Sequence, residues 1–243
     1  MVGIGPGGPG DRTRRAEQAI EQSGVVVGYT RYLKLIEDLT HGKEIISSGM
    51  TQEVVRCKAA LERAAGGAVV ALVSSGDAGI YGMAGLAMEL AQETGNHAPI
   101  EVVPGVTASS AAAAVLGAPL MLDYAVISLS DLLIPWVTVK ARLEAVAAAD
   151  LVVALYNPRS RKRTQQIEEA AKIFKRYRSG ATPVGIATSV GKEDESAVVS
   201  DLDHFLDCEI NMRSVVIVGN STSRLVDGRI VTPRGYGVGV GER

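Results

Sequence analysis

The sequence predicts an α/β protein with two α/β domains, the first built on a largely parallel sheet and the second on a mixed sheet. Short Val-, Ile- and Leu-rich runs alternate with Ala-rich amphipathic stretches, as expected where helices cover a parallel sheet. With 47% hydrophobic residues in 243, the chain can bury an aliphatic core as one large or two small domains. These two observations exclude a disordered or fibrous protein.

The first half predicts three strands that end in glycine loops. The expected elements, in order, are a short strand ending in the loop 3–10, a helix near 12–22, strand 25–27, a helix starting at Thr51 as N-cap, strand 68–73, the loop 74–79, a helix over 80–92, strand 100–103 and the bend 104–107. Carboxyl ends of parallel strands meet at one edge of a sheet, where open α/β folds bind ligands. The loops are therefore expected to converge on a binding site.

The second half begins where the Ala-rich helical pattern ends at Gly117 and Pro119, so we divide the chain into domains 1–116 and 117–243. The expected elements are strands 125–129, 151–155, 184–188 and 215–218, with a helix over 164–178. Asp227-Gly228 between apolar residues predicts a closing hairpin, which would make the second sheet mixed.

Charge and composition argue against several classes of protein. The formal net charge is −2 with scattered Lys and Arg, so no nucleic-acid partner is expected. No apolar run approaches the roughly 20 residues of a membrane span, and the start at Met1 lacks an export signal, so we expect a cytoplasmic protein with no membrane partner. The first strand is short at Met1, and we expect a few residues to be missing there. Cys57 and Cys208 are expected to be reduced, and no metal site is expected.

Gly3-x-Gly5-x-x-Gly8 fits the dinucleotide-binding pattern, which makes a nicotinamide-dependent reductase the enzymatic alternative. Pro6 removes a backbone donor, however, and Gly28-Tyr29 stand where an acidic residue should end the second strand. The loop is better suited to form a rigid wall without side chains, although an ordinary strand-to-helix turn is also open.

Two further motifs keep a structural alternative beside the functional one. Asp77, in the loop 75–79, could meet an adenosine ribose or could cap the helix expected near Ile80. The segment 159–163 places four cations in five residues, which could grip carboxylates or simply begin a solvated helix. A Ser–His–Asp triad is not supported by the spacing of the three histidines.

The motifs taken together resemble the tetrapyrrole methylase family. The residues that carry the resemblance are Gly3-Ile4-Gly5-Pro6-Gly7, Val26-Val27-Gly28-Tyr29, Met50-Thr51-Gln52-Glu53, Ser74 to Ala84 and Val103 to Ala108. In the second half, Leu116 to Leu120, Ile127 to Leu133 and Leu155 to Pro158 are similar to one branch, the precorrin-3B or cobalt-factor III C17-methyltransferases.

The resemblance implies S-adenosylmethionine as methyl donor, with S-adenosylhomocysteine as product, held in a cleft between the two domains. It also implies a tetrapyrrole substrate, precorrin-3B or cobalt-factor III, and a homodimer. The implied reaction is C17 methylation with ring contraction in cobalamin biosynthesis. Methylation at another position of the corrin, or a non-catalytic tetrapyrrole carrier, are the alternatives, although a carrier would not need the adenosyl loops.

The resemblance also implies which residues form the site. The cofactor residues are Pro6, Ser75, Gly76, Asp77, Ile80, Thr107, Ala108, Tyr156, Asn157 and Thr188. We expect the tetrapyrrole to lie against Gly5 and Gly7, with its carboxylates near Arg159, Arg161 and Arg163.

Ring contraction requires proton transfer, for which we expect Asp123, Ser128, Ser130 or Asp131 as donors or acceptors. The family pattern has a histidine at the position of Leu122. If that histidine moves a proton during contraction, this chain uses another group or is impaired.

Overall fold

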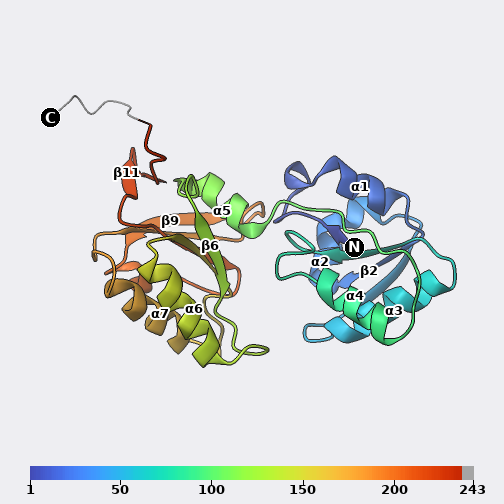
Figure 1. The fold of residues 1–243 in the computed structure, drawn as a ribbon. Coiled ribbons are helices and arrows are strands. Elements are labelled where there is room, and N and C mark those ends of the chain that lie inside the picture. The colour runs from blue at the N-terminus through green and yellow to red at the C-terminus, as the bar shows by residue number, and fades with distance from the viewer. Residues whose placement is uncertain (237–243) are drawn as a thin grey trace. The chain divides into compact units, whose positions relative to one another are not determined.

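The computed structural model describes residues 1–236, which form two compact units. The first unit is Met1–Ala108, the second begins at Ser109, and each combines helices with a sheet (Figure 1). Helix α5 (Ala108–Leu116) therefore falls almost wholly in the second unit, whereas the division drawn from the sequence lies at the end of that helix. The roles expected of the two domains stay predictions.

The first unit contains a four-stranded sheet in the order β1-β4-β2-β3, and all its strand pairs are parallel. Its strands are β1 (Val2–Gly3), β2 (Val25–Tyr29), β3 (Glu44–Ser48) and β4 (Val70–Ser74). Its helices are η1 (Pro9–Asp11), α1 (Arg14–Glu21), α2 (Thr30–Leu33), η2 (Lys34–Leu39), α3 (Glu53–Ala65) and α4 (Ala84–Glu93). The parallel sheet predicted for this half is confirmed.

Helices cover both faces of this sheet, as Figure 1 shows for α1 on one side and α3 and α4 on the other. Val26 of β2 packs in the cluster that contains Ile20 of α1. Its neighbours Val25 and Val27 pack in the opposite cluster, with Cys57 of α3. Side chains alternate between the faces of a strand, so a strand covered on both sides must be apolar at every position.

Two local predictions in this unit are wrong. The strand expected over 100–103 is reduced to one bridge, in which Val103 lies parallel to Val2. Thr51 is not an N-cap, because its φ is 63° and its hydroxyl donates to the carbonyl of Met50, while α3 begins at Glu53. Thr51 thus makes the turn before the helix.

β3 was not predicted, because this edge strand is mostly exposed and lacks an apolar run.

The second unit holds a five-stranded mixed sheet in the order β6-β7-β10-β8-β9. Its strands are β6 (Tyr124–Ser128), β7 (Val152–Tyr156), β8 (Pro183–Thr188), β9 (Ser196–Asp201) and β10 (Ser214–Val218). A separate sheet contains β5 (Gly117–Ala118), β11 (Arg224–Val226) and β12 (Arg229–Val231). The helices are α6 (Trp136–Ala148), α7 (Gln165–Lys175) and η3 (Phe205–Asp207), besides α5.

The predicted hairpin is confirmed, since β11 and β12 pair antiparallel across Asp227 and Gly228, both with positive φ. Its predicted effect on the main sheet is wrong, because the hairpin joins β5 instead. The main sheet is mixed because β10 runs antiparallel to both of its neighbours, β7 and β8. Helices α6 and α7 contribute Leu143 and Phe174 to the core of this unit.

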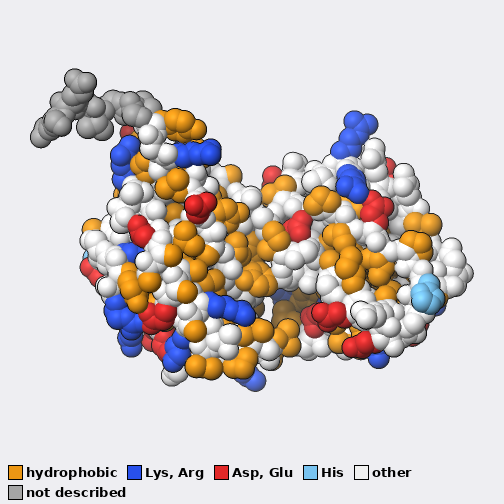
Figure 2. Space-filling view, in the orientation of Figure 1, with side chains coloured by type: hydrophobic (Ala, Val, Ile, Leu, Met, Phe, Trp, Pro, Cys, Tyr) orange, Lys and Arg blue, Asp and Glu red, His pale blue; other side chains and the backbone are white. Residues whose placement is uncertain are grey.

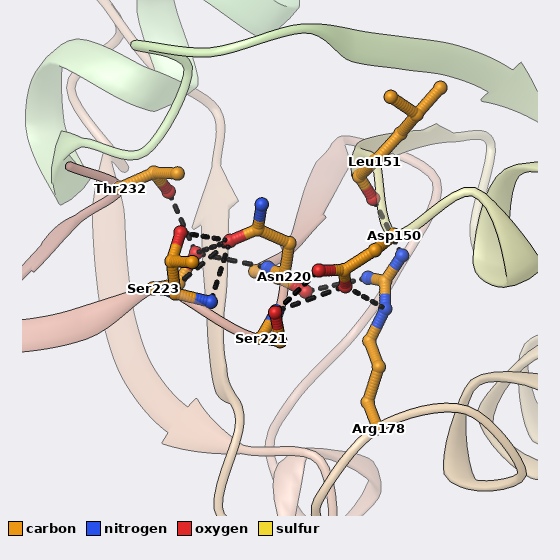
Figure 3. A network of polar contacts seen from close by, with 9 residues as sticks. Asp150, Leu151, Arg178, Asn220, Ser221, Ser223 and Thr232 are labelled. Atoms are coloured by element: carbon orange, nitrogen blue, oxygen red, sulfur yellow. Dashed lines mark hydrogen bonds and ion pairs between the residues drawn. The ribbon is translucent and has the colours of Figure 1, made fainter. Parts of the chain in front are cut away.

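A buried arginine joins the strand ends at one edge of the main sheet (Figure 3). Arg178 donates to the carbonyl oxygens of Leu151 and Gly219, at 2.6 Å each, and its guanidinium lies 4.8 Å from the ring centre of Phe174. Asp150 lies 3.7 Å from its Nε. Burial lowers the pKa of Arg178, while the charge of Asp150 acts in the opposite direction. Arg178 therefore links the start of β7 to the end of β10.

The described residues were searched for a membrane-spanning helix, and the visible face for clusters of like charge. Among those residues, no helix has both the length and the apolar character required to cross a bilayer. Basic and acidic side chains are interspersed over the visible face of each unit (Figure 2). Cys57 and Cys208 are both free thiols, and burial raises the pKa of Cys57 to about 11.

We predict that Arg178→Met lowers the free energy of unfolding by about 3 kcal/mol, because two buried carbonyl oxygens lose their donor. The apparent Tm should fall by roughly 8 °C in a thermal melt. Arg176→Met is the matched control, since Arg176 pairs with Glu144 on the surface and should matter by less than about 1 kcal/mol. Equal Tm values for the two variants would contradict this role of Arg178.

Candidate functional site

Backbone hydrogen bonds join three loops of the first unit at the carboxyl edge of its sheet. The amide of Gly3 donates to the carbonyl of Val103 at 2.9 Å. Gly5 and Gly76 exchange two hydrogen bonds, of 3.1 and 2.7 Å, so the loop after β1 pairs with the loop after β4. The convergence expected for the glycine loops is thus present within this unit.

The loops approach so closely that side chains are excluded. A Cβ on Gly3 would lie 2.7 Å from both the amide nitrogen of Gly105 and the carbonyl oxygen of Gly76. A Cβ on Gly105 would lie 2.6 Å from the carbonyl oxygen of Gly3 and closer still to that of Gly76. We call the contact of Gly3, Gly76 and Gly105 the glycine junction. The three loops therefore pack backbone against backbone at this point.

Asp77 links two of these loops through its carboxylate. Oδ1 accepts a hydrogen bond from the amide of Gly79 at 2.7 Å, and Oδ2 accepts one from the amide of Gly105 at 3.0 Å. Helix α4 begins at Ala84 without a side-chain cap, so the interpretation of Asp77 as a helix cap is wrong. Each carboxylate oxygen has more than one acceptor position, so Asp77 can still accept from a ligand hydroxyl.

The other cofactor residues expected in this unit lie in the same three loops. Pro6 is buried beside the junction, as is Gly7, whereas Ile80 is 40% exposed. Ser75, Thr107 and Ala108 are half-buried. The side chains that remain accessible here are therefore few and small.

A small pocket with several polar side chains lies beside the junction, in the same unit. Its lining residues come from the ends of β2 and β4, from α2, from the start of α3 and the residues before it, and from the segment before α4: Tyr29, Tyr32, Met50, Glu53, Arg56, Ser74, Ser75, Tyr81, Gly82 and Met83. Its volume is about 140 Å³. The sequence analysis assigned no role to Arg56, although an arginine on the same helix face as Cys57 and Ala60 was a detectable signal.

Larger cavities of this unit lie elsewhere. One has a volume of about 690 Å³ and is lined by residues of α3 and of the segment after α4, among them Lys58 and His97. Another has a volume of about 360 Å³ and is lined by residues at the amino ends of the strands, among them Met1 and Val69, and by Cys57 and Leu61 of α3. This cavity is mainly apolar and contains none of the glycine loops. Size alone therefore does not locate the functional site here.

In the second unit, the expected site residues at the ends of β6, β7 and β8 share one sheet edge. Ser128 pairs with Tyr156 in the parallel register of β6 and β7. β7 and β8 both run antiparallel to β10, so Thr188 ends its strand at the same edge as Tyr156. The hydroxyl of Thr188 is buried and hydrogen-bonded to that of Ser214 at 2.7 Å.

Asn157 is the centre of a polar network at this edge. Its φ is 51°, and its Nδ2 donates to Oγ of Ser128 at 3.0 Å, which also accepts from the amide of Ser130 at 3.2 Å. Arg163 donates to the carbonyl of Asn157 at 2.7 Å, while its buried Nε has no hydrogen-bond partner among residues 1–236. Burial lowers the pKa of Arg163, and the charge of Asp131 opposes this shift.

The remaining expected residues are dispersed. Asp123 is exposed and precedes β6, whereas Ser128 ends it, so about 16 Å of strand separates the two. Asp131 is exposed and accepts from Gln166 at 2.8 Å. In the basic segment, Arg159 lies 3.6 Å from Glu168 and Arg161 is exposed. Of the four candidate proton-transfer residues, Asp123 alone lies at the opposite end of β6.

Residues 1–205 match the profile of the family described as Tetrapyrrole (Corrin/Porphyrin) Methylases. The chain belongs to this family. It is 45% identical over 236 residues to the probable cobalt-factor III C(17)-methyltransferase of Salmonella typhimurium, covering 97% of this chain and 98% of that one. Members of this family use S-adenosylmethionine.

Two further comparisons point to the same branch of the family. The chain is 46% identical over 240 residues to the cobalt-factor III methyltransferase of Priestia megaterium, covering 97% of this chain but only 44% of that relative. The solved structure of the methyltransferase CobJ superposes with a TM-score of 0.89 at 34% identity, covering 96% of this chain and 98% of that one. The resemblance and the fold class predicted from the sequence are confirmed.

Gly105→Ala should disrupt the glycine junction, because the added methyl group meets backbone atoms that cannot move aside. We predict that this variant loses about 3 kcal/mol of stability and binds S-adenosylhomocysteine at least tenfold more weakly. Gly24→Ala is the control, since a Cβ there meets nothing within 4 Å. Thermal melts and calorimetric titration check both effects, and unchanged affinity in folded Gly105→Ala would contradict the assignment.

Proposed function

We propose that this protein is an S-adenosylmethionine-dependent methyltransferase that methylates C17 of precorrin-3B or cobalt-factor III, with ring contraction. The observation that carries the proposal is the 45% identity that extends over 98% of the Salmonella relative. The glycine junction supports it, since it fixes the three loops that carry the proposed cofactor residues relative to one another.

The proposed cofactor residues of the first unit fit a nucleoside with an amino-acid tail. Asp77 has acceptor positions for ribose hydroxyls, and Ser75 beside it offers a small polar side chain. Pro6, Gly76, Ile80, Thr107 and Ala108 complete this part of the proposed site. In the second unit we propose Tyr156, Asn157 and Thr188. When bound, S-adenosylmethionine supplies a methyl group on a positively charged sulfur.

The chain's own contribution to methyl transfer is mainly positioning. A carbon nucleophile must approach the methyl group in line, which needs fixed loops and exclusion of water more than acid–base groups. We propose that the macrocycle lies against the loop of Gly5 and Gly7 and that Arg159, Arg161 and Arg163 meet its carboxylates. The unpartnered Nε of Arg163 supports this proposal, because a buried donor without a partner is costly.

Ring contraction additionally requires protons to move, and we propose Ser128, Ser130 and Asp131 as the groups at the carboxyl edge of β6. Asn157 fixes Ser128 by donating to its Oγ, which orients the hydroxyl. Asp123, at the other end of the strand, is proposed as a separate group. Leu122 itself offers no proton-transfer group.

The decisive test uses the purified protein in one titration and one incubation, with a thermal-shift comparison of NADH and S-adenosylhomocysteine beside them. Calorimetry with S-adenosylhomocysteine measures cofactor binding, and anaerobic incubation with cobalt-factor III and S-adenosylmethionine, followed by mass spectrometry, measures methylation. A product with one added methyl group supports the proposal, and a parallel incubation with precorrin-3B distinguishes the two substrates. Binding without turnover of either substrate would favour a carrier, and stabilisation by NADH alone would contradict the proposal altogether.

Ser128→Ala should reduce contraction by about a hundredfold if its hydroxyl moves a proton, while Asp123→Asn should act independently of it. Methylation and contraction are measured separately, by product mass and by absorbance. Ser110→Ala, an exposed serine on α5, is the control. If Ser128→Ala and Asp123→Asn both leave the two rates unchanged, neither residue belongs to the mechanism.

We also propose a homodimer. The exposed side chains of Leu132, Leu133 and Val137, which are 76%, 89% and 70% accessible, support a protein contact in the second unit. Sedimentation equilibrium of the wild type and of Leu133→Asp tests this, and a wild-type monomer at all concentrations would contradict it.

A further inference from the structure

The pocket beside the glycine junction contains a buried cation whose hydrogen-bonding capacity is incompletely used. The side chain of Arg56 is only 4% exposed. Its Nη1 donates to Oγ of Ser48 at 2.7 Å and to the carbonyl of Gly49 at 2.8 Å, and its Nη2 lies 3.3 Å from Glu53. Its Nε is buried and has no partner among residues 1–236. The position of Arg56 is thus fixed by the hydrogen bonds of Nη1, while its Nε–H remains available as a donor.

A second buried polar atom in the pocket is also unsatisfied. Ser74 ends β4 and is 3% exposed, and its Oγ has no hydrogen-bond partner within the described part of the chain. Leaving such a group unpaired costs about 1–3 kcal/mol, so two of them in one small pocket call for an explanation. A ligand that accepts hydrogen bonds from both would remove this cost.

The aromatic residues around Arg56 hold the cation in place. The guanidinium lies 5.9 Å from the ring centre of Tyr29, and the rings of Tyr29 and Tyr32 contact edge to face at 5.1 Å. Burial raises the pKa of Tyr32, so its hydroxyl remains protonated and can donate. The pocket therefore offers several donors near one positive charge, partly balanced by the half-exposed Glu53.

The volume limits what can enter. A water molecule occupies about 30 Å³ and whole small-molecule ligands need roughly 300–1,000 Å³, so 140 Å³ suits one peripheral group of a larger molecule. A planar anion with two acceptor oxygens fits an arginine edge best, since guanidinium and carboxylate geometries match. The donors and the size together indicate a single carboxylate.

We propose that Arg56 and Ser74 bind one side-chain carboxylate of the tetrapyrrole and so fix the orientation of the macrocycle on the first unit. This inference rests on the proposed function. Tyr29 ends β2, and Met50 and Glu53 lie before and at the start of α3, where there are no proposed cofactor residues, whereas Ser75 of the proposed cofactor site also lines the pocket. We assign the carboxylate to the substrate, and the binding of S-adenosylhomocysteine in the test distinguishes this source from the amino-acid carboxylate of S-adenosylmethionine.

The test compares Arg56→Lys and Ser74→Ala with the wild type in two separate binding measurements. Lysine keeps the charge but lacks the Nε donor, and Ser74→Ala removes a hydroxyl that makes no hydrogen bond within residues 1–236, so both variants should fold. We expect the Kd for cobalt-factor III, measured anaerobically by absorbance, to rise about tenfold for Arg56→Lys and about fivefold for Ser74→Ala. The Kd for S-adenosylhomocysteine should stay within about twofold of the wild type.

Two control variants match these changes. Arg63→Lys alters an exposed arginine of the same helix, which pairs with Glu44, and Ser23→Ala alters a buried serine before β2 at the other edge of the sheet. Both should bind cobalt-factor III as the wild type does. Steady-state kinetics should show a raised KM for the tetrapyrrole in Arg56→Lys and Ser74→Ala, with kcat much less changed.

Three outcomes would overturn the inference. They are unchanged tetrapyrrole affinity in both variants, weaker binding of S-adenosylhomocysteine in place of the tetrapyrrole, or an equal loss in the control variants. The second outcome would assign the pocket to the cofactor's carboxylate. Failure of the wild type itself to bind cobalt-factor III or precorrin-3B would instead reject the proposed function, so the two failures are distinguishable.

Discussion

The first unit depends on the contact of three backbone segments at the glycine junction. Parallel strands alone bring loops to one edge of a sheet, but they do not make those loops touch. Here the loops after β1 and β4 exchange hydrogen bonds through Gly5 and Gly76, and Gly105 fits against them because it has no Cβ. The loops hold one another in position, so a ligand need not order them, which reduces the entropic cost of binding. Asp77 adds a side-chain link to the same contact.

Those parts of the fold that depend on local pattern could be predicted from the sequence. Apolar runs predicted β2, β4, β7, β8 and β10, and Asp227-Gly228 predicted the hairpin. Both kinds of element depend on a few consecutive residues, so the sequence alone reveals them. Two edge strands, β3 and β9, were missed. Neither has a buried residue, and their apolar residues are few and flanked by polar ones. The position of the hairpin in its own small sheet depends on β5, a partner more than 100 residues away, which no local pattern reveals.

The residues of the candidate site likewise fall into those that a local sequence pattern predicted and those that depend on the three-dimensional structure. The glycine loops and Asp77 were identified because their spacing after strands is a local signal, and the family resemblance supplied their chemistry. The separation of Asp123 from Ser128 follows from the length of β6, and the predicted strand 125–129 already implied it. The links from Asn157 to Ser128 and from Arg163 to Asn157 could not be foreseen, because they depend on the positive φ of Asn157 and on side-chain directions. The burial of Arg56 could not be predicted in the same way, because a single cation on a helix face is usually exposed and its partners Ser48 and Gly49 lie outside the helix.

In the second unit, the strand ends at one edge of the main sheet carry structural links, and those at the opposite edge carry proposed site residues. Arg178 and Asp150 tie strand ends together at one edge, and Ser128, Asn157 and Thr188 lie at the other. Under the proposed function, mutations that alter substrate preference can therefore accumulate at the second edge while the first keeps the unit folded. A family with this division can explore new positions of methylation on related macrocycles without first acquiring extra stability, and protein engineers could use the same separation by reinforcing the Arg178 edge before they redesign the other.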